Sequence, residues 1–238
     1  DVNFWGVVNC LKSFVKDFPL LQNAELIAIA ARDKERAKTF AATHNIPQAF
    51  TYDELYNSDE VDAVYISTTH NFHFEQSLQC LLHGKAVLCE KPITINDTEF
   101  KQLAAISKEK NFFLMEAMWS YFLPAIIKAQ QWVNEGRIGD LKIIQADFAF
   151  PMEKNMEGRM YNPDLAGGAL LDLGVYNVAL ATLFMNRKPD SVTATAILTE
   201  TGVDATTTMI LKYGDTIATL CTSMVTRMTN KLRLFGET

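Results

Sequence analysis

The sequence has few cysteines, no excess of basic residues and no long hydrophobic run. The four cysteines among its 238 residues are Cys10, Cys80, Cys89 and Cys221, and no two form a CxxC pair. This usage is typical of a reducing compartment, where cysteines are small buried hydrophobes. No stretch reaches the ~18–20 uninterrupted apolar residues of a membrane span. The net charge of −6 argues against a nucleic-acid-binding protein.

The composition is that of a folded globular protein, with 48% hydrophobic and 21% charged residues. The length fits one large domain or two of ordinary size. The first residues do not show the basic segment followed by a long apolar one that marks a secretory signal. We therefore expect a cytoplasmic protein with no nucleic-acid or membrane partner.

Residues 1–119 alternate short apolar runs with amphipathic stretches. The predicted strands are 4–8, 26–31, 63–67, 86–89 and 112–117, and the predicted helices between them are 11–21, 34–43, 72–82 and 97–108. Runs without polar alternation are typical of strands buried on both faces, and the intervening helices imply parallel crossovers. This pattern predicts an α/β domain with a doubly wound parallel sheet.

Residues 120–238 follow a different rhythm. The pattern predicts helices over 124–135 and 168–184, a loop over 151–163, and strands over 141–150, 191–199, 205–211, 216–225 and 232–235. Short turns such as Tyr213-Gly214-Asp215 favour antiparallel pairing. We predict an α+β domain built on an open, mainly antiparallel sheet.

This predicted sheet has no closing element, because the sequence stops directly after its last strand. An open sheet with an apolar face needs a cover, either more chain or a partner. The sequence also starts without a methionine. We therefore expect either a domain that is truncated at its C-terminus or a homodimer formed through the open sheet.

The first cluster of chemical interest is Glu90-Lys91-Pro92, which follows the predicted strand 86–89. Ligands of open α/β sheets bind beyond the carboxyl ends of the strands, so a charged pair there faces a ligand site. Lys91 precedes a proline and is expected to be held extended. The alternative is a surface Glu–Lys pair that caps the strand, and position alone does not decide between the two.

The second cluster begins with Gly167-Gly168 and continues to Asp172 and Tyr176. Side chains four residues apart share one face of a helix. The two glycines permit a close backbone approach, either by a ligand or by another element. An Asp–Tyr stripe on an apolar helix is an active-site wall or a satisfied core network, and on these residues alone the core network is the simpler interpretation.

Together, the two clusters resemble the glucose–fructose oxidoreductase/inositol dehydrogenase (Gfo/Idh/MocA) family. Glu90-Lys91-Pro92 matches its EKP motif, and residues 167–176 match its GG…D-x-G-x-x-[HY] helix. Residues 30–33, 84–92, 114–119 and 201–204, with tyrosine at 176, resemble a narrower branch of NADP-dependent dehydrogenases. The resemblance implies that residues 1–119 form a Rossmann-type dinucleotide-binding domain and residues 120–238 a domain for substrate binding and dimerisation. It also implies hydride transfer between nicotinamide and a small polyol, either an aromatic trans-dihydrodiol that becomes a catechol or D-xylose that becomes a lactone.

The resemblance also implies that Lys91, Asp172 and Tyr176 form the proton-transfer group. A phenol has a pKa of about 10, so a tyrosine that acts as a base near neutral pH needs a pKa about three units lower. One ammonium group ~4 Å away supplies about that much at an effective dielectric constant near 20. We expect Tyr176 to be the acid/base, Lys91 the charge that lowers its pKa, and Asp172 the group that orients it.

The residues after the predicted strand 26–31 bear on the choice of cofactor. An NAD site places a carboxylate there for the ribose hydroxyls, whereas an NADP site places arginine. Arg32 and Arg36 are spaced to clamp a 2′-phosphate, and we therefore expect NADP. The alternative is that Arg36 is a solvated surface charge and Asp33 is only a helix N-cap.

Further site residues are implied by the resemblance. Those expected at the cofactor, besides the two arginines and Lys91, are Gly6, Ser67, Thr68, His70 and Glu90; those expected at the substrate are His73, Trp119 and Phe148. Trp119 is equally typical of a core, and Phe148 is a weaker candidate of the same kind. A zinc site made of His70, His73, Cys80 and His83 is disfavoured, because one helix cannot wrap four tetrahedral ligands. We expect no metal.

The first crossover departs from the family pattern. A glycine-rich turn normally lets backbone N–H groups meet the pyrophosphate at a helix N-terminus. Residues 6–14 contain no glycine after Gly6. A second hypothesis is therefore a truncated or degenerate relative that acts as a non-catalytic binding or dimerising scaffold, and a titration with NADPH separates it from the enzyme.

Overall fold

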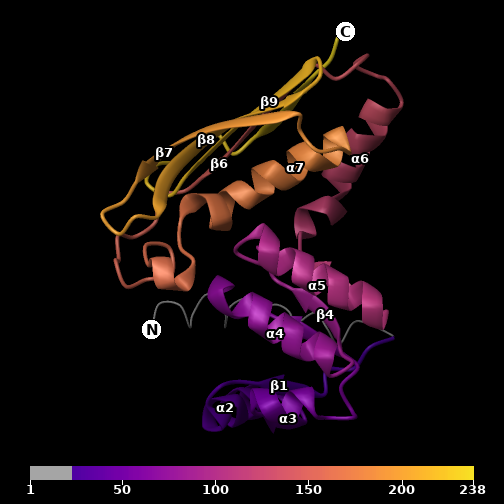
Figure 1. Cartoon of the computed structure of the whole chain (residues 1–238), viewed down its shortest axis with the longest axis vertical. Helices are drawn as coiled ribbons and strands as arrows, with labels where there is room; N and C mark the ends of the chain where they lie inside the picture. The colour runs from indigo at the N-terminus through magenta and orange to yellow at the C-terminus, as the bar shows by residue number, and fades with distance from the viewer. Residues whose placement is uncertain (1–22) are drawn as a thin grey trace. The chain divides into compact units, whose positions relative to one another are not determined.

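The computed structural model describes residues 23–238 and divides the chain into two compact units (Figure 1). The first unit comprises residues 1–117 and the second residues 118–238. Each unit has a hydrophobic core of its own. The predicted strand 4–8 and helix 11–21 lie outside the described residues.

The described strands of the first unit all pair in parallel. They are β1 (Ala28–Ala30), which pairs with β2 (Gln48–Phe50), and β4 (Ala86–Cys89), which lies between β3 (Ala63–Ile66) and β5 (Leu114–Glu116). Ile66 stands opposite Cys89, and Cys89 opposite Glu116. The three strands of the second group therefore end at one edge, where Ser67 and Glu90 begin the following loops.

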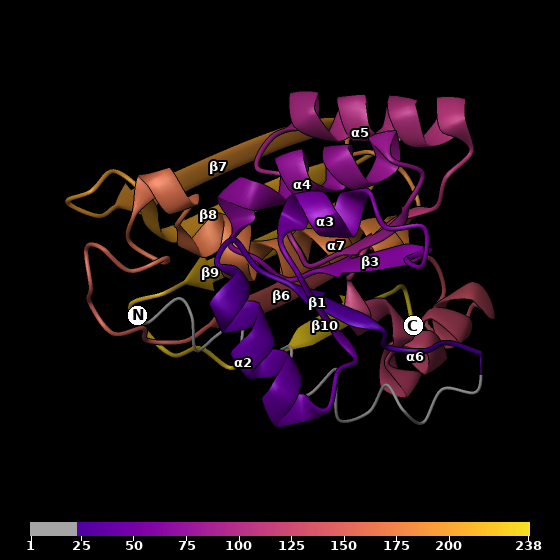
Figure 2. The same cartoon turned by 90° about the horizontal axis from the view of Figure 1, so that it is seen from below.

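Helices connect these strands, as the alternating pattern predicts. They are α2 (Lys34–His44), α3 (Tyr52–Tyr56), α4 (His70–Leu82) and α5 (Asp97–Lys110), and α4 and α5 lie side by side (Figures 1 and 2). Asp33 caps α2 by accepting a hydrogen bond from Glu35 N at 3.0 Å. Leu81, Val87 and Leu103 fill the core between helices and strands. The predicted Rossmann-like parallel sheet is confirmed.

Cysteines of the first unit belong to this core. Cys80 and Cys89 have no exposed surface, and burial raises the pKa of each thiol to about 12. They are therefore protonated and unreactive near neutral pH. Like Cys221 of the second unit, they are free thiols. The interpretation of these two cysteines as small buried hydrophobes is confirmed.

The second unit is built on a five-stranded mixed sheet in the order β10-β6-β9-β8-β7. Its strands are β6 (Ile143–Ala149), β7 (Ser191–Leu198), β8 (Asp204–Tyr213), β9 (Thr216–Ser223) and β10 (Leu232–Phe235). All neighbours pair antiparallel except β6 and β9, which run parallel. The predicted open, mainly antiparallel sheet is confirmed, and the insertion of β6 between β9 and β10 is an addition to it.

Short helices and two longer ones complete the second unit. They are η2 (Trp119–Phe122), α6 (Pro124–Asn134), η3 (Pro163–Leu165), the π-turn η4 (Leu170–Gly174) and α7 (Val175–Met185). Helix α7 packs on the inner face of the sheet, where Ala181 is fully buried and Asn177 Nδ2 donates to Cys221 O at 2.9 Å. The stretch Pro163–Met185 is long and apolar enough to cross a membrane by length and composition, a test that a core helix also passes.

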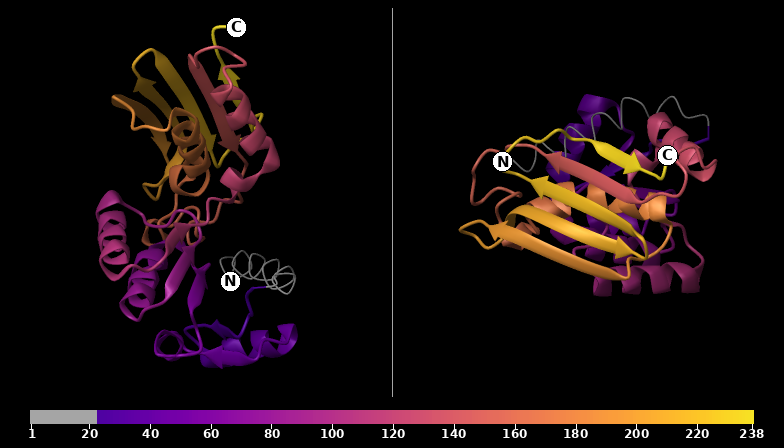
Figure 3. Two further views of the ribbon diagram at one scale, coloured as in Figure 1. Left: turned by 90° about the vertical axis from the view of Figure 1, so that its right-hand side faces the viewer. Right: turned by 90° about the horizontal axis from the view of Figure 1, so that it is seen from above.

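Figure 3 (right) shows the sheet from its outer face, opposite α7. Exposed apolar side chains lie on this face. Strand alternation places Ile210 and Ile217 on this face, opposite the buried Met209 and Ala218 of the inner face. The homodimer expected through this face stays a prediction, as does the cytoplasmic location.

The division between the units falls slightly before the predicted boundary at 119/120. Two side chains of η2 explain this position. Trp119 Nε1 donates to Tyr176 Oη at 2.9 Å, and Tyr121 Oη donates to Ala179 O at 2.9 Å. Both acceptors belong to α7, so η2 packs with the second unit.

Candidate functional site

Two glycines bring the loop before η4 against the start of that helix. A Cβ on Gly167 would lie 2.7–2.9 Å from three backbone oxygens of the loop, those of Arg159, Met160 and Asn162. Gly168 has a φ of 116°, a conformation that favours glycine. The element that approaches these glycines closely is therefore the chain's own loop.

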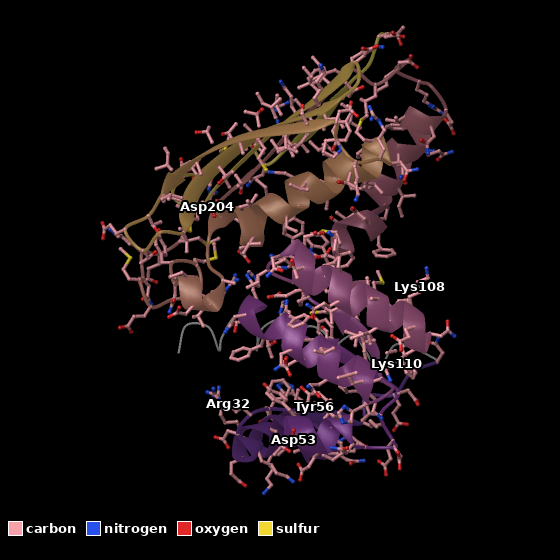
Figure 4. All side chains as sticks on the ribbon, viewed as in Figure 1. Arg32, Asp53, Tyr56, Lys108, Lys110 and Asp204 are labelled. Carbon is pink, nitrogen blue, oxygen red and sulfur yellow. The ribbon has the colours of Figure 1, made fainter. Side chains whose placement is uncertain are left out.

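Asp204 holds the start of η4 from the other side. Its Oδ2 accepts hydrogen bonds from Leu170 N at 2.9 Å and from Thr207 Oγ1 at 2.6 Å. A Cβ on Gly168 would collide with its other carboxylate oxygen. Figure 4 labels Asp204 beside the sheet of the second unit. The residues 201–204 that contribute to the family resemblance thus include the cap of the helix that carries the site.

Asp172 and Tyr176 lie on consecutive elements, because the predicted continuous α-helix 168–184 begins as a π-turn. Asp172 belongs to η4 and Tyr176 to the first turn of α7. Gly174 lets η4 approach β9 closely, since a Cβ there would lie 3.0 Å from Thr222 Cγ2. A π-turn closes i→i+5 hydrogen bonds and is frequent at functional sites. Asp172 and Tyr176 therefore remain about one turn apart.

Arg159 forms a two-pronged ion pair with Asp172. Its Nη1 donates to Oδ1 at 2.8 Å and its Nη2 to Oδ2 at 3.3 Å. The Asp172 side chain is only 6% exposed, and a buried carboxylate needs such a paired partner. Sequence reasoning missed Arg159, since a single basic residue in a loop without periodicity gives no signal beyond its place just before the glycine pair.

Tyr176 lies in an aromatic cluster with Trp119, Phe148 and Phe150. The ring centroids of Phe148 and Tyr176 are 5.2 Å apart, those of Trp119 and Tyr176 5.9 Å, and those of Phe148 and Phe150 5.1 Å. Phe148 reaches Tyr176 because it shares the inward face of β6 with Ile144. Trp119 is 53% exposed. The cluster therefore places the exposed Trp119 ring next to the phenol of Tyr176.

The hydrogen bond from Trp119 Nε1 makes the Tyr176 oxygen a hydrogen-bond acceptor. An indole N–H only donates, so the phenol oxygen is the acceptor in this bond. A donor at that oxygen stabilises the ionised phenolate over the neutral phenol. The second unit by itself therefore supplies one of the interactions that favour a basic tyrosine.

In the first unit, two carboxylates hold the segment around Lys91. Glu90 accepts a hydrogen bond from the Tyr65 hydroxyl, and its N–H donates to Ile66 O at 2.8 Å. Glu116 Oε1 accepts from Ile93 N at 2.9 Å. Burial raises the pKa of the Glu116 carboxyl, and the Ile93 hydrogen bond and the charge of Lys91 oppose that rise. The Lys91–Pro92 peptide bond is cis, which the sequence does not predict.

The expected contact of His73 with substrate is not supported. The ring is fully buried, with Nδ1 2.7 Å from Pro92 O and Nε2 3.0 Å from Thr68 O. Burial lowers its pKa. His73 instead joins α4 to the loops that follow β3 and β4, including the one that carries Lys91.

A metal site is equally unsupported among the described residues. They contain no group of three or more His, Cys, Asp or Glu side chains that could hold a metal ion. In the zinc alternative, both ring nitrogens of His73 face backbone carbonyls and His83 Nδ1 lies 2.8 Å from Gln79 O. Cys80 is buried with a raised thiol pKa.

The other cofactor residues expected in the first unit lie near the edge where β3 ends. Ser67 and His70 are buried, and Thr68 Oγ1 donates to Gln76 Oε1 at 2.8 Å. Gly6 lies outside the described residues. The cofactor contacts of these side chains and of Glu90 stay predictions.

Arg32, labelled in Figure 4, is exposed just after β1. Arg36 of α2 is exposed as well. The carboxylate between them in sequence, Asp33, is engaged as the N-cap of α2. The capping interpretation of Asp33 is thus confirmed. The choice between a 2′-phosphate and the ribose hydroxyls as the group held at this position stays a prediction.

Fold and site together define a class: a Rossmann-like dinucleotide-binding unit followed by a mixed-sheet unit that carries an Asp–Tyr pair. Residues 6–118 match the model described as "Oxidoreductase family, NAD-binding Rossmann fold". Residues 126–238 match the GFO/IDH/MocA C-terminal domain. The chain belongs to the GFO/IDH/MocA oxidoreductase family.

Two curated relatives illustrate the similarity at the level of sequence. The chain is 41% identical over 215 residues to trans-1,2-dihydrobenzene-1,2-diol dehydrogenase of Xenopus laevis, which covers 89% of the chain and 64% of that relative. It is 36% identical over 242 residues to the protein of that name from Homo sapiens, covering 98% of the chain and 71% of the relative. The chain therefore spans about two thirds of the length of these relatives.

Solved structures agree on the fold. Aldose-aldose oxidoreductase from Caulobacter crescentus, complexed with glycerol, matches with a TM-score of 0.86 at 23% identity, over 94% of the chain and 70% of that structure. A 3-ketoreductase from Actinomadura kijaniata, in complex with NADP and TDP-benzene, matches with a TM-score of 0.82 at 30% identity, over 94% and 69%.

Proposed function

We propose that this chain is the catalytic part of an NADP-dependent dehydrogenase that moves hydride between nicotinamide and a small polyol. An aromatic trans-dihydrodiol, which the printed name of its relatives indicates, is the first candidate substrate, and D-xylose is the second. The observation that carries the proposal is the phenol of Tyr176, held by an indole N–H within an aromatic cluster.

The proposed reaction assigns a proton to Tyr176 and a hydride to the cofactor. Bound NADP supplies the hydride acceptor. The Tyr176 phenolate takes the proton of the substrate hydroxyl, and the carbon that bore this hydroxyl becomes a carbonyl as it loses hydride. Lys91 provides the positive charge that favours the phenolate, and Asp172 orients the tyrosine. In the reverse direction the same phenol returns the proton.

The proposed cofactor is NADP, with Arg32 and Arg36 as the groups that hold its 2′-phosphate. Two arginines bind a phosphate through charge-assisted hydrogen bonds. Asp33 does not compete for this role, because its carboxylate accepts the Glu35 N–H as a helix cap. That a 3-ketoreductase relative was solved with NADP supports the same choice.

Replacing both Arg32 and Arg36 by glutamine is expected to raise the Kd for NADPH about 10–100-fold, since a hydrogen bond to a charged group contributes ~1.5–3 kcal/mol. The Kd for NADH, which lacks the phosphate, should change by less than about twofold on the same argument. Fluorescence titration with each nucleotide measures both values. Lys38→Gln is the matched control, because Lys38 lies on α2 and pairs with Glu35 at the surface. An equal loss for both nucleotides contradicts the assignment.

Trp119 and Phe148 are proposed as walls of the substrate site. Trp119 is exposed next to the phenol, and Phe148 contacts the other side of the cluster. The conjugated diene part of a dihydrodiol can stack on such faces, and a sugar ring can place its C–H face on them. Both substrate classes therefore fit the same pair of side chains.

Trp119→Phe is expected to move the acidic limb of the pH profile of kcat/KM, where the oxidation rate rises as Tyr176 ionises, to higher pH. The indole hydrogen bond stabilises the phenolate, and losing ~0.5–1.5 kcal/mol corresponds to a rise of about half a unit to one unit in the apparent pKa. Steady-state rates of dihydrodiol oxidation across pH measure the shift. The control is Trp132→Phe, a second exposed tryptophan whose ring contacts Lys128 and Arg137. Identical profiles for both variants and the parent chain would remove Trp119 from the mechanism.

The enzyme and the non-catalytic scaffold are separated by binding and turnover of the 238-residue chain. Saturable NADPH binding together with NADP-dependent oxidation of a trans-dihydrodiol or D-xylose is expected. Saturable binding without turnover of either substrate overturns the proposed substrate class. Absence of saturable binding overturns the enzyme and favours the scaffold, in keeping with the sequence of residues 6–14.

A further inference from the structure

We propose that Arg159 is a positioning residue of the proton-transfer site, acting through Asp172. Its guanidinium fixes the carboxylate of Asp172 and cancels its charge, so that Tyr176 ionises beside a neutralised pair. The inference rests on the proposed role of Tyr176 as acid/base.

The backbone around Arg159 is held in place by the glycine pair. Gly167 N donates to Asn162 O at 3.1 Å, and Gly168 N donates to Met160 O at 2.9 Å. The absence of a Cβ on Gly167 lets the carbonyls of this loop come within contact distance. Arg159 is therefore anchored to the start of the helix whose Asp172 it binds, and little side-chain freedom is lost when the ion pair forms.

The geometry of the pair matches the task of orientation. Two parallel N–H···O bonds fix both the position and the plane of the Asp172 carboxylate. The carboxylate is buried, whereas the Arg159 side chain is 36% exposed. Arginine keeps its charge at every working pH. The pair is thus present throughout the pH range in which Tyr176 would act.

The charge of Asp172 makes Arg159 necessary in this account. A carboxylate one turn from a phenol opposes its ionisation by repulsion between like charges. An arginine on that carboxylate cancels most of the repulsion while leaving the oriented oxygens in place. An unpaired Asp172 would instead raise the pKa of Tyr176 and impede the base.

Other charged groups on elements packed against η4 and α7 have partners of their own. Asp204 of β8 is bound by Leu170 N and Thr207. Asp147 of β6 accepts from Thr229 Oγ1 at 2.8 Å and from Asn230 N at 2.6 Å, and Arg233 of β10 lies 4.0 Å from it. These groups are unchanged in the variants below, so they do not account for a difference among them.

The test is a cycle of variants read by the near-ultraviolet absorbance of tyrosinate. Each variant is titrated with and without Tyr176→Phe, and the difference reports Tyr176 alone, independent of turnover. Arg159→Gln is expected to raise the apparent pKa of Tyr176 by about one unit. Adding Asp172→Asn to Arg159→Gln should return it to within a few tenths of the parent value, because the uncompensated charge is gone. Arg159→Lys should retain most of the parent behaviour.

Controls separate this role from a structural one. Lys154→Gln removes a charge from the same loop, where Lys154 pairs with Glu200 at the surface, and should leave the titration unchanged. If the role of Arg159 is purely structural, Arg159→Gln lowers the melting temperature without changing the apparent pKa of Tyr176. In that case, adding Asp172→Asn does not reverse the effect of Arg159→Gln. Either result overturns the proposal. If Arg159→Gln fails to fold, the deciding comparison is Arg159→Lys against the double variant Arg159→Lys/Asp172→Asn. Equal tyrosinate titrations of these two variants would refute the proposal.

The kinetic counterpart distinguishes failure of this inference from failure of the proposed function. Arg159→Gln is expected to lower kcat about tenfold, as a shift of one unit in pKa implies, with KM changed by less than about twofold. If the parent chain has no NADP-dependent turnover, the proposed function fails, yet the titration still decides whether Arg159 controls Tyr176.

Discussion

Tyr176→Phe should lower kcat about 10²–10⁴-fold, the contribution of a positioned acid/base group. The variant keeps the ring that packs on Phe148 and Trp119 and loses only the oxygen that accepts the indole N–H. Cofactor affinity should be unchanged, because the residues proposed to bind NADP belong to the first unit. Single-turnover oxidation and NADPH titration of the same preparation measure the two effects separately.

Tyr121→Phe is the matched control for this loss. Its hydroxyl donates to Ala179 O on α7, so the variant removes a phenol oxygen of comparable packing from the same helix contact. Its kcat should stay within about twofold of the parent chain, since a neutral hydrogen bond of this kind contributes only ~1 kcal/mol to stability. Comparable activity in Tyr176→Phe and Tyr121→Phe would refute the role of Tyr176.

Gly167→Ala is expected to lower the stability of the chain strongly. A Cβ there would lie 2.7–2.9 Å from three backbone oxygens, none of which can move without shifting the loop. Overpacking costs ~1–3 kcal/mol or more, which for a chain of this size corresponds to a melting temperature lower by about 5–10 °C. The displaced loop carries Arg159, so activity should fall as well. Thermal unfolding followed by circular dichroism measures the change.

Gly136→Ala is the comparison for Gly167→Ala. Gly136 has a φ of 72°, and a Cβ there would meet nothing within 4 Å. Its cost is therefore conformational strain alone, ~1–2 kcal/mol. A melting temperature of Gly167→Ala at or above that of Gly136→Ala would show that the loop yields, and that the glycine pair does not anchor Arg159.

Most elements of the first unit are legible in the sequence. Strand β4 has the predicted bounds, because a buried parallel strand is an unbroken apolar run. The missed elements β2 and α3 are only three and five residues long. A local signal for α3 does exist, since Thr51 and Glu54 form a capping box that sequence spacing shows.

Features of the second unit that the sequence does not show depend on distant partners. Strand β6 pairs with β9 and runs parallel to it. A local sequence pattern does not predict which strands pair with each other. The π-turn η4 depends on the approach of Gly174 to Thr222 of β9. A helical pattern in sequence does not distinguish such a turn from an α-helix.

The site follows the same division. Tyr176 and Asp172 stand out because a motif carries them at a fixed spacing. Arg159 is legible only in the structure, because its partner is set by the folding of a loop. Histidine is a common ligand-binding residue, yet both ring nitrogens of His73 face backbone carbonyl oxygens. Residue type indicates which chemistry is available, whereas burial and partners decide whether it is used.

The central claim is that Tyr176 is a base, and its ionisation is the most direct measurement. The near-ultraviolet absorbance of tyrosinate is followed across pH in the parent chain and in Tyr176→Phe, and the difference isolates one phenol. The account predicts half-ionisation within about one unit of neutral pH, where a catalytic base is effective. Ionisation at about pH 10 or above, as in an ordinary tyrosine, would contradict it.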